Sequence, residues 1–187
     1  GQALGQGGEW DRSDAHLMHL AAQAYPFLNS RKQLWWAAMF EAYATALCDA
    51  QMVNGLFQRR VKKENTDPAN NAYAPLGSGA HAIAKITEEA LLANSLFAIT
   101  KTDTLSPELH TRTMQALVNH CVDGLWKFAW LEGATGAAPY DYVAVAPIAG
   151  GAPYSTCPAH YNNDREEIGA EIGHMLEASP VRVTDID

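Results

Sequence analysis

One long apolar stripe between residues 35 and 61 constrains the fold of this chain more than any other feature. Apolar residues recur there every three or four positions, which is the spacing of one side of an α-helix. The members of the stripe are Trp35, Met39, Tyr43, Ala46, Ala50, Val53, Phe57 and Val61, and it is widened by Trp36, Phe40 and Leu47. So wide an apolar arc is typical of a central core helix. We expect this helix to begin at Asn29 or Ser30 and to continue past Gly55 to about Lys63.

A shorter helix is expected before it. Asp11 or Ser13 can cap the first turn of this helix. The Tyr25-Pro26 pair ends it, because the residue before a proline is driven out of the helical region. One face of the helix is apolar and is expected to be hidden from water. That face comprises Leu17, Leu20, Ala21 and Ala24.

Two further helices are expected between residues 78 and 132. Ser78 can cap a third helix that runs to about Lys101. Its inward face comprises Ile83, Ile86, Ala90, Ala93 and Phe97. The stretch 106–109, Ser-Pro-Glu-Leu, has a capping serine, a proline at the first helical position and an acid that complements the positive helix end. It predicts a fourth helix that runs to Glu132.

A last helix is expected near the end of the chain. Asp164 and Glu167 form a capping pair that opens it, and Pro180 ends it. Between the fourth helix and this one, residues 133 to 163 carry a single charge together with four glycines, four prolines and four tyrosines. The stretch 140–147 could form a short strand, and the rest is expected to be irregular. Loops of this length are often binding loops or lids.

These elements together predict an all-α fold, a single-domain helical bundle of about five helices with one long Gly/Pro/Tyr-rich loop. Residues 1–8 are expected to be a flexible N-terminal segment or a cloning remnant, and residues 9–187 a single helical domain. The chain has 187 residues, which suffices for one hydrophobic core and is short for two.

Composition excludes some classes of partner. The formal net charge of −8 argues against a nucleic-acid partner, because contacts to phosphate need a basic face. No apolar run reaches the ~18 to 20 residues that span a bilayer. The three cysteines contain no CxxC pair, so we expect neither a metal clip nor a disulfide framework, although one bridge remains possible. The residues identify no cofactor, oligomeric state or compartment.

One group of residues could hold a metal ion. Glu171 and His174 have the Glu-x-x-His spacing of carboxylate-bridged di-iron bundles, but a second such pair is absent. With His160 and Asp164 they define a candidate site, His160, Asp164, Glu171 and His174. The alternative interpretation is the solvated side of an amphipathic helix.

Two other histidines are expected in first helical turns. His81 and His110 would lie near the positive end of a helix dipole, which disfavours a charged imidazole. Such a histidine suits a neutral base or a metal ligand. It equally suits a buried histidine that is hydrogen bonded to a carbonyl group.

Three fragments resemble the motifs of the helical lipid-phosphatase and vanadium-haloperoxidase superfamily. They are Arg60 with Asp67-Pro68, the stretch 77–81 (Gly-Ser-Gly-Ala-His), and 160–164 (His-Tyr-Asn-Asn-Asp). The resemblance implies a basic phosphate or vanadate cradle with a histidine acid and a His-Asp pair. The chain departs from the pattern at Asp67, at an extra alanine before His81, and at Tyr154, where an arginine is wanted. Without its arginines such a site lacks the charge that stabilises the transition state, so the chain is not assigned to this family.

The function that the sequence favours is a helical binding or interaction module. It would present the apolar loop 133–163 to a protein or small-molecule partner, through the contact residues Tyr140, Tyr142, Tyr154 and Tyr161. Tyrosines give amphipathic contact surface at low entropic cost. The alternative is a purely structural role, in which the loop covers the open end of the bundle. The rival function is a hydrolytic, metal-dependent enzyme with its site at His160, Asp164, Glu171 and His174 under the same loop.

Overall fold

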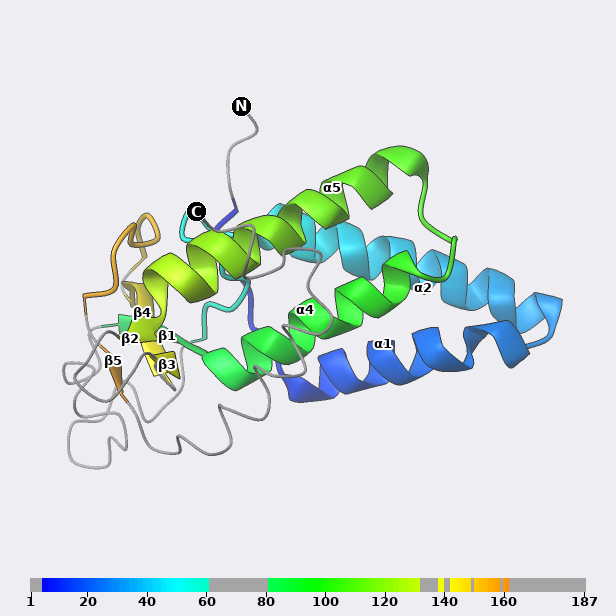
Figure 1. Ribbon diagram of the computed structural model, residues 1–187, viewed down its shortest axis with the longest axis horizontal. Helices are drawn as coiled ribbons and strands as arrows, with labels where there is room; N and C mark the ends of the chain where they lie inside the picture. The colour runs from blue at the N-terminus through cyan, green and yellow to red at the C-terminus, as the bar shows by residue number, and fades with distance from the viewer. Residues whose placement is uncertain are drawn as a thin grey trace.

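The computed structural model describes residues 5–60, 81–131, 138–139, 142–148, 150–158 and 160–161. Figure 1 shows the α-helices side by side along the length of the molecule, with the strands gathered at one end. The α-helices are α1 (Arg12–Ala24), α2 (Ser30–Ala50), α4 (Ile86–Thr100) and α5 (Pro107–Asn119). A short 3-10 helix, Tyr25–Phe27, follows α1, and a π-helix, His120–Phe128, continues α5.

The strands form two small antiparallel sheets. In the larger sheet β4 (Tyr142–Pro147) lies between β1 (His81–Lys85) and β5 (His160–Tyr161). The other sheet pairs β2 (Trp130–Leu131) with β3 (Ala138–Pro139). Four consecutive residues of β4, from 143 to 146, are buried, so this strand is the apolar centre of the sheet end.

The prediction of an all-α bundle of about five helices is wrong, because the described chain is mostly helical but also contains these strands. Residues 81–85 were expected inside the third helix and instead form β1, which pairs with β4. The strand expected within 140–147 is confirmed as β4. A nearly chargeless segment that is buried must pair its backbone N–H and C=O groups, and a second strand supplies the partners. Residues 81–85 therefore form a strand, and α4 begins only at Ile86.

Helix starts follow the local capping signals. Asp11 caps α1 with a complete capping box, Asn29 caps α2, and Ser106 caps α5, as the sequence predicts. The backbone N–H of Ser13 donates to the Asp11 carboxylate and holds the pKa of Asp11 below its ordinary value. A depressed pKa means that this cap stabilises the fold above the unfolded pKa and is lost as pH falls. The caps expected at Ser78 and Asp164 lie outside the described residues.

The predicted extension of α2 to Lys63 is wrong, because the helix ends at Ala50. The chain then turns at Gly55, whose φ of +83° is favourable only for glycine. The turn brings Gly55 against the π-helix, where Gly124 lies directly opposite. Residues 5–8, part of the segment expected to be flexible, bond to this same region: Gly5 N–H donates to Gln51 O at 2.8 Å, and Gly8 N–H to Phe57 O at 2.9 Å.

The core contains a face of α1 that the sequence did not predict. α1 packs on α4 through Ala15, Met18, Ala21 and Ala22. The expected burial of Leu17 and Leu20 is wrong, because these side chains are 55% and 62% exposed. Small alanines allow the two helices to approach closely, so α4 takes the alanine side of α1 and leaves the leucine side outward.

Substituting Gly55 tests whether the end of α2 is set by this close approach. A Cβ atom at Gly55 would lie 2.5 Å from Asn119 O. Gly150 is the matched control, since its φ is +94° and a Cβ atom there meets nothing within 4 Å. We expect Gly150→Ala to lower the free energy of unfolding by about 1–2 kcal/mol through backbone strain alone. Gly55→Ala should cost a further ~1–3 kcal/mol from the clash, measured by urea denaturation. Equal losses for the two variants would contradict the assigned packing.

Candidate functional site

A buried carboxylate, Glu89, lies in the first turn of α4 and joins three parts of the chain. Both its oxygens accept the backbone N–H of Phe57 at 3.0 Å, and one accepts the N–H of Gln58 at 2.5 Å. His120, at the start of the π-helix, places Nε2 at 3.0 Å from the carboxylate. The Glu89 side chain is 0% exposed and His120 is 1% exposed. Both side chains are therefore buried, and the Glu89 carboxylate is bonded to backbone N–H groups and to the His120 imidazole.

A second layer of polar groups surrounds this pair. Glu88 forms ion pairs with Arg60 and, at 3.8 Å, with Arg12. The Gln58 side-chain amide donates to Glu88 at 2.9 Å and accepts the backbone N–H of Lys85 at 2.9 Å. These bonds attach residues 58–60 to the start of α4 and to β1. The arrangement supplies acceptors for backbone groups of residues 57, 58 and 85.

Glu89 and His120 were not predicted as a pair from the sequence, although one signal pointed to Glu89. Glu88 and Glu89 are adjacent acids on a helix that is apolar on nearly every other side, so one of them has to face the core. Buried acids are paired or hydrogen bonded, which makes a buried partner a necessary consequence. Nothing local marks His120 as that partner, because it is 31 positions away in the sequence.

Two of the four predicted contact tyrosines lie at the sheet end with their side chains described. The Tyr154 hydroxyl is 2.9 Å from His81 Nδ1, and the two rings meet edge to face with centroids 5.6 Å apart. The Tyr154 backbone N–H donates to Val145 O at 2.8 Å. Its carbonyl oxygen accepts from the Asn54 side chain at 3.2 Å. Tyr154 is half-buried and held at both its backbone and its hydroxyl.

Tyr142 lies at the start of β4, between strands on both sides. Its backbone pairs with Lys85 of β1 and with Tyr161 of β5. The Lys85 ammonium lies over the Tyr142 ring, with Nζ 5.7 Å from the ring centroid. The sheet thus brings Tyr142 and the backbone of Tyr161 together. The fourth tyrosine, Tyr140, lies outside the described residues.

A cation, Arg59, holds the segment that carries Tyr154. Its guanidinium donates to Gly151 O and to Pro147 O, each at 3.2 Å. It also donates to the Gln6 side chain at 3.0 Å. These bonds connect the start of the chain, the end of β4 and residues 150–158. At the sheet end, hydrogen bonds from Arg59 therefore hold the segment that carries Tyr154.

The predicted metal site is described only in part. His160 belongs to β5, and its backbone pairs with Val143 of β4. Asp164, Glu171 and His174 lie outside the described residues. Within the described ranges no three side chains of His, Cys, Asp or Glu come close enough to hold a metal ion.

The two histidines expected in first helical turns differ in outcome. His110 lies in the first turn of α5, as predicted, and is half-buried. The prediction for His81 is wrong, because it is the first residue of a strand and contacts Tyr154. Arg60 belongs to the first of the three fragments that resemble phosphatase motifs. It forms an ion pair with Glu88, which neutralises the positive charge of its guanidinium.

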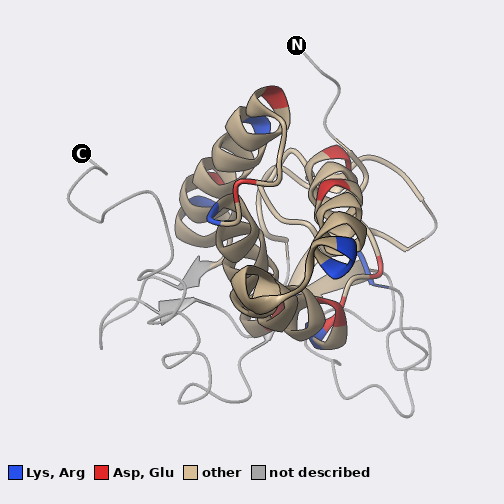
Figure 2. Ribbon diagram, turned by 90° about the vertical axis from the view of Figure 1, so that its right-hand side faces the viewer, with Lys and Arg blue, Asp and Glu red and all other residues tan. Residues whose placement is uncertain are grey.

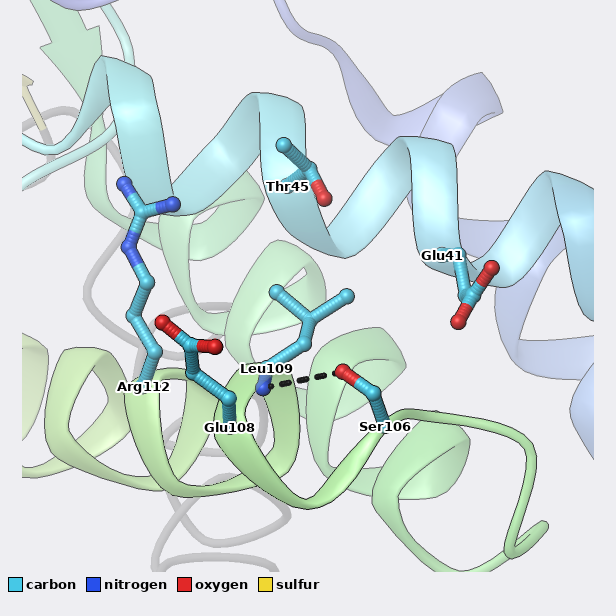
Figure 3. A pocket seen from close by; sticks show the side chains of 6 residues that line it. All are labelled: Glu41, Thr45, Ser106, Glu108, Leu109 and Arg112. Carbon is cyan, nitrogen blue, oxygen red and sulfur yellow. Dashed lines mark hydrogen bonds between the residues drawn. The ribbon is translucent and has the colours of Figure 1, made fainter.

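A pocket of about 280 Å³ lies between α2 and α5, away from the sheet end. Figure 3 shows its lining residues, Glu41, Thr45, Ser106, Glu108, Leu109 and Arg112. Ser106 Oγ accepts the N–H of Leu109 at 3.3 Å as the helix cap. Arg112 is paired with Asp49, whose hydrogen bond raises the pKa of the guanidinium. The serine and the cation of this pocket are thus both engaged, and the carboxylates of Glu41 and Glu108 also line it.

Comparisons place the chain in no known family. Neither the protein-family models, nor the curated proteins, nor the solved structures give a significant match. The fold defines a mostly helical protein whose described strands form two small antiparallel sheets at one end. Within the described residues, no helix has the length and apolar character required to cross a membrane.

Replacing Glu89 tests how much the buried carboxylate contributes to the free energy of unfolding. In Glu89→Gln one oxygen becomes an amide donor that faces other donors, so we expect a loss of about 3–5 kcal/mol in the free energy of unfolding. Glu108→Gln is the matched control, because Glu108 also lies in the first turn of a helix but is exposed. Its loss should stay below about 1 kcal/mol. Chemical denaturation measures the free energy of unfolding of both variants. Similar losses in the two would show that the Glu89 carboxylate does not stabilise the fold.

Proposed function

We propose that this protein is a binding module and that its contact surface is the tyrosine-bearing segment 133–163, whose described residues lie at the sheet end. Tyr142 and Tyr154 are the central contact residues of this surface, and Tyr140 and Tyr161 belong to the same segment. The partner is a peptide segment of another protein. No catalytic step is assigned to this surface.

The observation that carries the proposal is the fixed position of Tyr154. Its hydroxyl is bonded to His81 at 2.9 Å and its backbone to Val145 at 2.8 Å, while the side chain stays half-exposed. A side chain that is already ordered loses little conformational entropy when a partner covers it. Rigid tyrosines are the usual anchors of recognition surfaces for this reason.

The charges beside the tyrosines favour one chemistry of partner. Arg59 lies beside the segment that carries Tyr154, and its guanidinium donates to the uncharged carbonyl groups of Pro147 and Gly151. The protein as a whole carries a net charge of −8, so a cation beside the tyrosines stands out from the rest of the chain. An acidic peptide with an aromatic or proline anchor complements both features, because its carboxylates meet Arg59 and its rings meet the tyrosines.

Selection from a random peptide display library tests this surface directly. We expect the wild-type protein to enrich acidic peptides, and Tyr154→Ala to weaken their binding at least about 10-fold in calorimetric titration. Trp126→Ala is the control, because Trp126 is an aromatic side chain that is 40% exposed on the π-helix. It should leave the affinity unchanged. The proposal fails if no peptide is enriched, or if enriched peptides bind Tyr142→Ala and Tyr154→Ala as tightly as wild type.

The metal-dependent hydrolase remains a second proposal for one reason. The backbone of His160 in β5 pairs with Val143 of β4, so this one of the four proposed ligands belongs to the same sheet as Tyr142. The other three ligands are Asp164, Glu171 and His174. In this alternative the site would activate water for hydrolysis.

Metal analysis separates the two proposals. If the protein is a binding module, we expect purified protein to hold no stoichiometric metal, and His160→Ala with His174→Ala to leave its metal content and melting temperature unchanged. About one equivalent of tightly held metal that both substitutions release would favour the hydrolase. His16→Ala is the control for non-specific histidine binding, because His16 is exposed on α1.

A further inference from the structure

An apolar stripe on the outer side of α1 has no covering element among the described residues. Leu17 and Leu20 are 55% and 62% exposed, and Ala24 continues the same side of the helix. Phe27, in the 3-10 turn that follows, is 88% exposed. We call these four residues the α1 stripe. Leucine and phenylalanine side chains left in water at this density mark an interaction surface.

The spacing of the α1 stripe is that of a helix-pairing seam. Leu17, Leu20 and Ala24 follow one another at intervals of three and four residues, as the two apolar positions of a heptad do, and Phe27 lies beyond the end of α1 in the 3-10 turn. α1 already uses a different side, Ala15, Met18, Ala21 and Ala22, to pack on α4. The helix therefore has two apolar faces, and the outer one carries the larger side chains.

Charge is distributed unequally along the stripe. At its start, Asp11 and Asp14 flank the first turn of α1, while Arg12 is directed to Glu88 at 3.8 Å. At its other end, Arg31 and Lys32 are exposed at the start of α2. Figure 2 views the molecule from this end and shows basic residues at the near end of α2. One end of the stripe is acidic and the other is basic.

We propose that the α1 stripe binds the α1 stripe of a second copy of this chain, antiparallel and about a two-fold axis. In this arrangement Leu17 faces Phe27 of the partner subunit, and Leu20 faces Ala24 of the partner subunit. The acidic start of each helix then meets the basic end of the other, and the helix dipoles oppose. A surface that is acidic at one end and basic at the other is self-complementary only in this orientation.

The expected strength follows from the length of the seam. α1 has 13 residues, so the paired helices share about 20 Å. That contact is small beside the ~800 Å² per partner of a standard interface. Leu34 and Trp35, in the first turns of α2, are 75% and 57% exposed, and Figure 1 shows that α2 begins at the end of the molecule where α1 ends. A contact of this size favours a weak, reversible dimer, so association should depend on the protein concentration.

Sedimentation equilibrium over a series of protein concentrations tests the dimer. We expect wild type to associate from monomer to dimer, and Leu20→Glu to weaken association at least about 100-fold, because the two-fold axis introduces the buried charge twice. Leu17→Glu should act in the same direction. Val53→Glu is the matched control, because Val53 is 49% exposed beyond the C-terminal end of α2. It should associate as wild type does.

The charge pattern gives an independent readout. Lys32→Glu should weaken association, and Asp14→Lys in the same chain should restore it, which only the antiparallel pairing predicts. A chain that stays monomeric at every concentration overturns the proposal, as does equal weakening by Val53→Glu. If the monomer instead binds neutral lipid vesicles through Leu17 and Leu20, the stripe is a membrane contact and the dimer is wrong. Peptide binding at Tyr154 should be unchanged by Leu20→Glu, so the two proposals fail separately.

Discussion

The structure depends on one buried acceptor, the carboxylate of Glu89. It accepts two consecutive backbone N–H groups of the segment after α2, at Phe57 and Gln58, and it lies against His120 of the π-helix. Without it these groups would be buried with no partner, at a cost comparable to a large share of the stability of a small domain. The stack of Phe57 on His120, with centroids 5.1 Å apart, then fills the space around the acceptor.

The position of the chain at the sheet end depends on this Glu89 carboxylate. Because Glu89 holds the chain at Phe57 and Gln58, the next residue, Arg59, reaches the carbonyl groups of Pro147 and Gly151. Those bonds place the segment that carries Tyr154 against β4. The position of the candidate contact surface thus depends on a buried polar cluster, and long-range hydrogen bonds connect the two.

The helix starts could be predicted from the sequence, whereas most contacts of the candidate site could not. Asp11, Asn29 and Ser106 cap helices through bonds to residues two or three positions away, so local sequence predicts them. Tyr154 could be predicted as a contact residue because the segment 133–163 is rich in tyrosine and carries a single charge. Its partner His81 is 73 positions distant, and only the pairing of β1 with β4 brings the two together. Periodicity also misplaced the buried side of α1, because both of its faces are apolar.

By itself, the sequence determined the existence and the starts of most helices, the short strand 142–147, and the presence of a nearly chargeless tyrosine-rich segment. Tertiary structure decided that residues 81–85 form a strand, that α2 stops before Gly55, and that alanines rather than leucines of α1 face the core. The physical reason is the range of the interactions. Caps and turns are satisfied by neighbours in the chain, whereas buried acceptors, sheet partners and close helix contacts are satisfied by residues that folding alone brings near.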